Sequence, residues 1–177
     1  MGTPLVDLEV DLTTNALAFL KRAVYQLTVE GSEQDEIESL TFAIVDVAIA
    51  LELLLKARLA REHWSLIIAN VDRANEASLV NGAAATVTPD QAVTRLKEIS
   101  HVAFGDGADS RTKQIERMIK LRNRAAHFTV AGEAPAGLRA QIGEGLAAIM
   151  WFLETHSRTT RDAATAKLVD DLIEEVA

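Results

Sequence analysis

The chain is poor in the residues that form disulfides and in those that break helices. Its 177 residues include no cysteine, three prolines, nine glycines and only 5% aromatic side chains. The lack of cysteine excludes disulfide bonds and thiolate metal sites. The few prolines and glycines, beside 49% apolar residues, argue against a disordered or linker-rich protein. We therefore expect a folded domain that holds neither a metal nor another cofactor.

The sequence also lacks a segment that would span or target a membrane. The longest stretch without a charged side chain, 77–89, has thirteen residues, which are too few to cross a bilayer as a helix. The first residues lack the basic start and the apolar stretch of a signal peptide. We expect a cytoplasmic protein without a membrane partner.

Charge is unevenly distributed along the chain. The net charge is −8, which by itself disfavours non-specific binding to nucleic acid. Residues 111–124, however, contain six basic side chains and one acid, so this segment carries +5 and the rest of the chain −13. The sequence thus combines one basic stripe with an acidic body.

Apolar residues recur at helical spacing along most of the chain, and no convincing pair of alternating strands is present. Ser32 with Asp35, and Thr88 with Gln91, have the spacing of capping boxes. Thr13, Thr14 or Asn15 is expected to cap the first helix. The pattern predicts helices over about 12–30, 32–63, 110–128, 136–156 and 160–177, a short helix that begins at 88–89, and an irregular connection over 64–88.

The expected fold is an all-α helical bundle, in a single domain over residues 1–177. Its core, over about 12–156, contains four to five main helices plus the short helix and the irregular connection; a C-terminal helix follows over about 160–177. The helix over 32–63 is expected at the centre, because 43–55 is apolar nearly all round and only Asp46 and Glu52 interrupt it.

The basic segment also carries an apolar stripe. On a helix, Arg122 falls in the middle of that stripe, where an unpaired charge costs several kcal/mol or more. We therefore expect Arg122 either to form a structural ion pair with an acid of the helix over 32–63 or to face a shared pocket. The stripe comprises Ile115, Met118, Ile119, Ala125 and Ala126.

His127 shares a helix face with Asn123 and Lys120. Taken alone, a histidine near the carboxyl end of a helix has a structural interpretation, because its charge favours the helix dipole. The two alanines before His127 leave room for another molecule to approach that face.

Arg122, Asn123 and His127 match the Arg-polar-…-His motif of HEPN (higher eukaryote and prokaryote nucleotide-binding) domains. The stretch 50–59, ALELLLKARL, is similar to the first core helix of this family, with Glu52 and a following basic residue in an apolar frame. The order of a long buried helix, an irregular connection and the motif near the end of a later helix resembles the family over roughly 12–156.

This resemblance implies a metal-independent endoribonuclease, commonly a toxin of a toxin–antitoxin pair or a phage-defence protein. RNA would be the substrate, a 2′,3′-cyclic phosphate the product, and a cognate antitoxin protein a further partner. His127 would exchange protons with the reacting hydroxyl, since an imidazole titrates near neutral pH. Arg122 would grip phosphate oxygens, and Asn123 would orient the histidine or the phosphate.

Other charged residues would support these catalytic residues. Lys113, Lys120 and Arg124 would attract the RNA backbone. Glu52 and Asp46 are the candidate counter-ions of Arg122, and the resemblance favours Glu52. The alternative for Glu52 is a helical pair with Lys56, four residues further on.

Helix geometry makes a second copy necessary for catalysis. Five residues correspond to about 140° of rotation and about 7.5 Å of rise, so Arg122 and His127 of one helix do not converge well on one phosphate. A homodimer with a two-fold axis would bring Arg122 of one copy towards His127 of the other. The alternative is a non-catalytic helical module that binds a nucleotide, RNA or a protein, in which Arg122 is structural.

Overall fold

The computed structural model describes residues 8–108, 110–127, 130 and 132–157, and in them the fold is an all-α bundle. No strand is present in these ranges, which contain only an isolated antiparallel bridge between Ile68 and Thr86. The expected helix over 160–177 lies outside the described residues. The long helices are α1 (Leu8–Leu27), α2 (Glu33–Glu62), α5 (Arg111–His127) and α6 (Pro135–Phe152).

Short elements connect and extend the long helices. Between α2 and α5 lie η1 (Trp64–Ile67), η2 (Val71–Arg73), α3 (Glu76–Val80) and α4 (Pro89–Glu98). One π-helical turn, η3 (Leu153–Ser157), follows α6. The irregular connection expected over 64–88 is therefore made of single turns.

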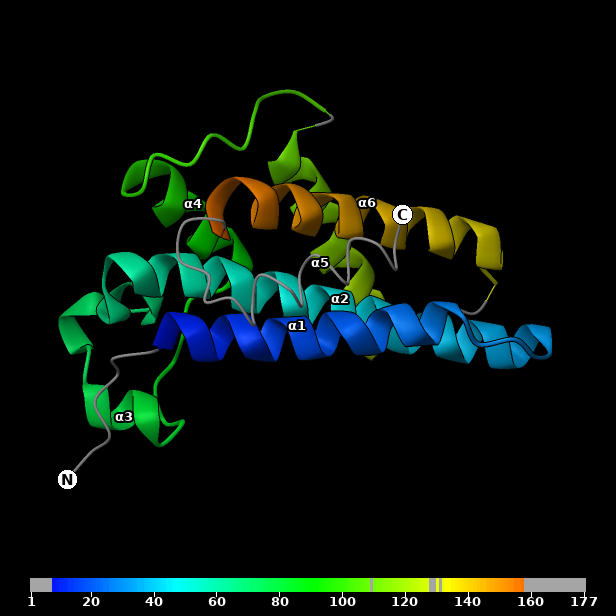
Figure 1. Cartoon of the computed structure of the whole chain (residues 1–177), viewed down its shortest axis with the longest axis horizontal. Helices are drawn as coiled ribbons and strands as arrows, with labels where there is room; N and C mark the ends of the chain where they lie inside the picture. Colours follow the sequence, from blue (N-terminus) through cyan, green and yellow to red (C-terminus); the bar gives the residue numbers. More distant parts are fainter. Residues whose placement is uncertain (1–7, 109, 128–129, 131, 158–177) are drawn as a thin grey trace.

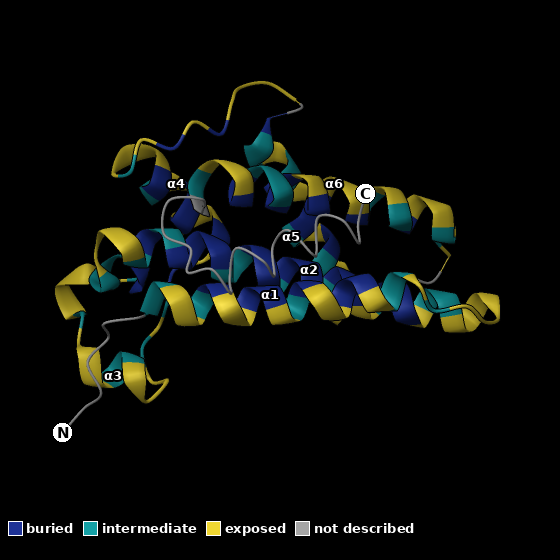
Figure 2. Ribbon diagram, viewed as in Figure 1, coloured by how far each residue is buried: buried dark blue, intermediate teal, exposed yellow. Residues whose placement is uncertain are grey.

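Helix α2 is the centre of the bundle, as its apolar sequence predicts. It packs against α1, α4, α5 and α6, and α1 runs alongside it as its antiparallel neighbour (Figure 1). Figure 1 also shows α5 crossing the long axis that α1, α2 and α6 share. The buried residues concentrate on α2 and on the sides of α1 and α6 that face it (Figure 2).

Local capping explains where several helices begin. The capping boxes of Ser32 with Asp35 and of Thr88 with Gln91 are both present. The side-chain hydrogen bond from Ser32 lowers the pKa of Asp35. Thr13, by contrast, is not a cap, because its hydroxyl donates to the Glu9 carbonyl oxygen at 2.8 Å. Helix α1 begins earlier than expected, at Leu8, and both Leu8 and Leu12 pack against the core.

Close packing of α6 fixes the position of α5. A Cβ atom on Gly145 would lie 2.6 Å from Met118 Sδ and 3.1 Å from Val47 Cγ1. Any larger residue at 145 would have to displace the Met118 side chain and push Val47 aside, so the glycine suits this close approach of α6 to α5 and α2. This packing holds α5 against the centre of the bundle.

Candidate active site on helix α5

The buried side of α5 differs from the predicted stripe by a small rotation. Ile115 and Met118 are buried as expected, but Leu121 is buried with them and Ala126 is exposed. The reason is that α5 packs against both α2 and α6, which widens its buried side. Arg122 consequently lies at the edge of the apolar stripe, with 27% of its side chain exposed.

Arg122 faces α2 and belongs to a small polar network. Its Nη2 lies 3.8 Å from Glu52 Oε2. The other oxygen of the same carboxylate accepts a hydrogen bond from Lys56 Nζ at 2.6 Å, and Lys56 Nζ also donates to Thr86 Oγ1 at 2.9 Å. Glu52 thus contacts both of the partners that the sequence predicts for it, Arg122 and Lys56. The shorter, stronger one is with Lys56.

Asp46 is not a counter-ion of Arg122. Its carboxylate is almost completely buried and accepts two hydrogen bonds from Arg22 of α1, one of them from Nε at 2.6 Å. The guanidinium of Arg22 also lies over the Phe19 ring, 4.9 Å from its centroid. Asp46 therefore joins α1 to α2, through a partner, Arg22, that its spacing in the sequence did not predict.

Asn123 and His127 lie on the solvent-facing side of α5, rotated away from Arg122. Both are exposed, and His127 is the last residue of the helix. Neither side chain forms a hydrogen bond or ion pair with another residue in the part of the chain that the structure describes. Within one copy of the chain, the His127 imidazole and the Arg122 guanidinium therefore lie on different sides of α5, as the rotation of about 140° between them predicts.

The three basic residues expected to bind RNA differ in whether an acidic side chain already pairs with them. Lys113 donates to Glu116 at 2.7 Å, and Arg124 pairs with Glu133 at 2.5 Å. Lys120 is exposed and forms no ion pair with another described residue. The hydrogen bond from Lys113 lowers the pKa of Glu116, and the charge of Lys120 lowers it further.

Residues outside the predicted set complete the surroundings. Arg117 donates to Glu144 of α6 at 2.7 Å, so a further charge of the basic stripe is compensated. Lys56 donates to the Glu52 oxygen that does not face Arg122, and Thr86 accepts a second hydrogen bond from the same Lys56 amine. The spacing of Glu52 and Lys56 could identify that pair, but nothing in the sequence signals the approach of Thr86 from the connection before α4.

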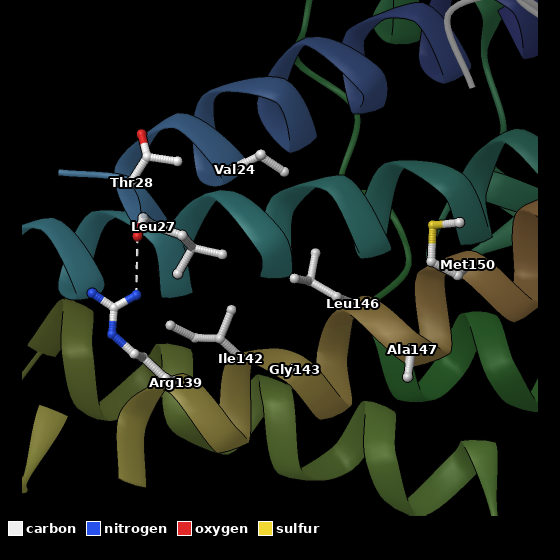
Figure 3. A pocket seen from close by; sticks show the side chains of 9 residues that line it. All are labelled: Val24, Leu27, Thr28, Arg139, Ile142, Gly143, Leu146, Ala147 and Met150. Atoms are coloured by element: carbon white, nitrogen blue, oxygen red, sulfur yellow. Dashed lines mark hydrogen bonds between the residues drawn. The ribbon is translucent and has the colours of Figure 1, made fainter. Parts of the chain in front are cut away.

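A separate groove of about 510 Å³ lies between α1 and α6 (Figure 3). Its walls are mostly apolar, and the residues that line it include no histidine or carboxylate. Its Arg139 side chain already donates to the Leu27 carbonyl oxygen and to Glu36. The groove therefore lacks the groups needed for acid–base chemistry, and α5 remains the candidate site.

Two further searches covered the described ranges. They contain no group of three or more His, Cys, Asp or Glu side chains that could hold a metal ion. None of their helices is both long and apolar enough to cross a bilayer. Comparison of the chain with protein-family models, with curated proteins and with solved structures gave no match.

Proposed function

We propose that the chain is a metal-independent endoribonuclease of the HEPN type, acting through Arg122, Asn123 and His127 in a homodimer. One observation carries this proposal. Arg122 is half-buried beside α2, and its one ion pair with a described residue is the 3.8 Å contact with Glu52, while the exposed His127 ends the same helix. An arginine can bind a phosphate when its guanidinium is held in place and still has N–H donors free. The long contact with Glu52 leaves Arg122 in that state.

The chemistry needs only the side chains of this motif. The 2′-oxygen of RNA attacks phosphorus, and the bond from phosphorus to the 5′-oxygen breaks. The His127 imidazole accepts the proton of the 2′-hydroxyl, and the imidazolium then supplies a proton to the leaving 5′-oxygen. The Arg122 guanidinium of the other copy stabilises the charge that develops on the phosphate oxygens. The product is a 2′,3′-cyclic phosphate.

The biological setting follows from the resemblance alone. A ribonuclease of this type would serve as a toxin or a phage-defence protein in the cytoplasm. Its activity would be held in check by a cognate antitoxin protein. Exposed Lys120 would attract the RNA backbone, and Lys113 and Arg124 would contribute after exchanging their acidic partners for phosphate.

The direct test is cleavage of RNA in excess EDTA. The wild-type chain is expected to cleave, while Arg122→Ala and His127→Ala lower the rate by about 100-fold or more. Arg117→Ala is the matched control, because it removes an arginine of the same helix that pairs with Glu144. Equal activity in all variants, or activity that chelation abolishes, would refute the proposal.

A second candidate function is a non-catalytic module that binds RNA, a nucleotide or an acidic protein. The contact of Arg122 with Glu52 favours it, because that contact is sufficient for a structural arginine. Under this alternative, Arg122→Ala lowers the melting temperature and His127→Ala changes nothing. Loss of cleavage in a His127→Ala variant that melts at the wild-type temperature would exclude it.

A further inference from the structure

The outer side of helix α6 is apolar, although a helix side that faces solvent is normally polar. Residues 136, 140, 143, 147 and 150 are spaced by three or four positions, so they follow one line along the helix. They are two alanines, a glycine, an alanine and a methionine, and all except the partly buried methionine are exposed. The described residues therefore leave this line, which we call the α6 stripe, uncovered.

The α6 stripe forms one wall of the groove between α1 and α6 (Figure 3). Gly143, Ala147 and Met150 line this groove of about 510 Å³. Val24 and Leu27 of α1 lie on its other wall. A Cβ atom on Gly143 would meet no atom within 4 Å. The groove is thus an apolar surface with room for side chains from another segment.

The segment over 160–177 has the sequence pattern of a helix that fits such a groove. On a helix, its large apolar residues fall within about 140° of one another, and the charged residues of 167–175 fall on the other side. A helix with this pattern is stable only when its apolar side is covered by another element. The apolar residues are Leu168, Val169, Leu172, Ile173 and Val176.

Connection and length favour this segment over any other occupant of the groove. Helix α6 leads into η3, whose last residue is Ser157, so two residues separate the described chain from residue 160. So short a connection gives the segment an effective concentration of the order of millimolar at the groove, which a separate molecule lacks. Eighteen helical residues extend about 27 Å, and α6 has 18 residues. A helix that turns back after η3 would therefore cover the whole α6 stripe.

Charge favours the same occupant. The segment over 160–177 contains five acids and two bases, so its net charge is −3. Among the described residues that line the groove, the only charged one is Arg139, near the beginning of α6. The exposed Lys21 of α1 lies one turn before Val24 of the groove wall. An antiparallel helix would place its acidic end, 170–175, towards Arg139.

We propose that residues 160–177 form an amphipathic helix that packs antiparallel to α6 in the groove between α1 and α6. Val169 would then lie opposite Gly143, because it follows residue 160 by nine positions and Gly143 precedes the end of α6, Phe152, by nine. The groove lies on the side of α6 away from Gly145, the residue that contacts α5. The helix therefore leaves the candidate site uncovered, and its position does not depend on ribonuclease activity.

Cross-linking between two introduced cysteines tests where the segment lies. The chain has no cysteine, so Gly143→Cys with Val169→Cys introduces two thiols. A short bismaleimide is expected to join them within one chain at least about tenfold faster than in the control pair, Gly143→Cys with Asp171→Cys. Residue 171 lies on the charged side of the helix. Equal rates, or links formed only between two chains, would overturn the proposal.

The reactivity of a single thiol on the α6 stripe tests whether the segment covers it. In the full chain, Ala147→Cys is expected to react with a soluble disulfide reagent at least about tenfold more slowly than the same variant carrying Leu172→Asp and Ile173→Asp. Asp170→Asn with Asp171→Asn is the matched control, because it changes only the charged side and should leave the slow reaction unchanged. A fast reaction in every variant would show an open groove, and a slow one in every variant a different cover. Either result would overturn the proposal.

Discussion

The two carboxylates that interrupt the apolar part of α2 hold their arginines in different ways. Asp46 is almost completely buried, and both of its oxygens accept hydrogen bonds from Arg22. Glu52 is 27% exposed and is shared between Lys56, at 2.6 Å, and Arg122, at 3.8 Å. Arginines from two different helices thus meet α2 in one tight pair and one loose pair.

The tight pair gives Arg22 a structural role, whereas the loose pair leaves the Arg122 guanidinium available to bind another group. The carboxylate of Asp46 has no other described partner for its charge, so Arg22 must stay with it. The Glu52 carboxylate also accepts a hydrogen bond from Lys56, so it would still have a cationic partner if Arg122 turned away. Exchanging Glu52 for a phosphate is therefore inexpensive for Arg122, whereas the same exchange would leave a buried charge at Asp46.

Removing Arg22 is expected to have the largest effect on stability. In Arg22→Ala, the Asp46 carboxylate remains in the interior without its two donors. We expect the free energy of unfolding to fall by about 3 kcal/mol, as measured by denaturant titration. The double variant Arg22→Met with Asp46→Leu should recover most of that loss, because it removes the buried charge together with its partner. A loss below about 1 kcal/mol in the single variant would show that the pair is not structural.

Removing the charge of Glu52 is expected to have a smaller effect. In Glu52→Gln, Lys56 and Arg122 lie close together without an acid between them. We expect a loss of about 1–2 kcal/mol, which is more than an exposed pair is worth. Glu62→Gln is the matched control, since Glu62 also pairs at i, i+4, with Arg58, and is more exposed. If both variants lose the same amount, Glu52 is an ordinary surface pair.

The sequence was sufficient to predict the helices and the central place of α2. Periodicity identified each long described helix, and two capping boxes gave the beginnings of α2 and α4. These features depend on neighbours within one turn. The end of α6 was less predictable, because Phe152 leads into a π turn rather than a continued α-helix.

The pairing of charges could not be predicted to the same extent. Whether Asp46 meets Arg22 or Arg122 depends on which helix packs on which side of α2, and spacing along the chain does not contain that information. The rotation that buries Leu121 and exposes Ala126 arises in the same way, from contact with α6. Folding of the chain beyond α5 likewise decides that Arg124 pairs with Glu133, whereas the pair of Lys113 with Glu116 is local, at i, i+3 within the helix.

Activity of a mixed dimer tests most directly whether Arg122 of one copy works with His127 of the other. Arg122→Ala and His127→Ala chains, each inactive alone, are combined and assayed for RNA cleavage in EDTA. One of the two sites in the mixed dimer then contains both an intact arginine and an intact histidine from different chains. We expect cleavage to return to about half of the wild-type rate per mixed dimer. A mixed dimer as inactive as its parents would contradict a site shared between two copies.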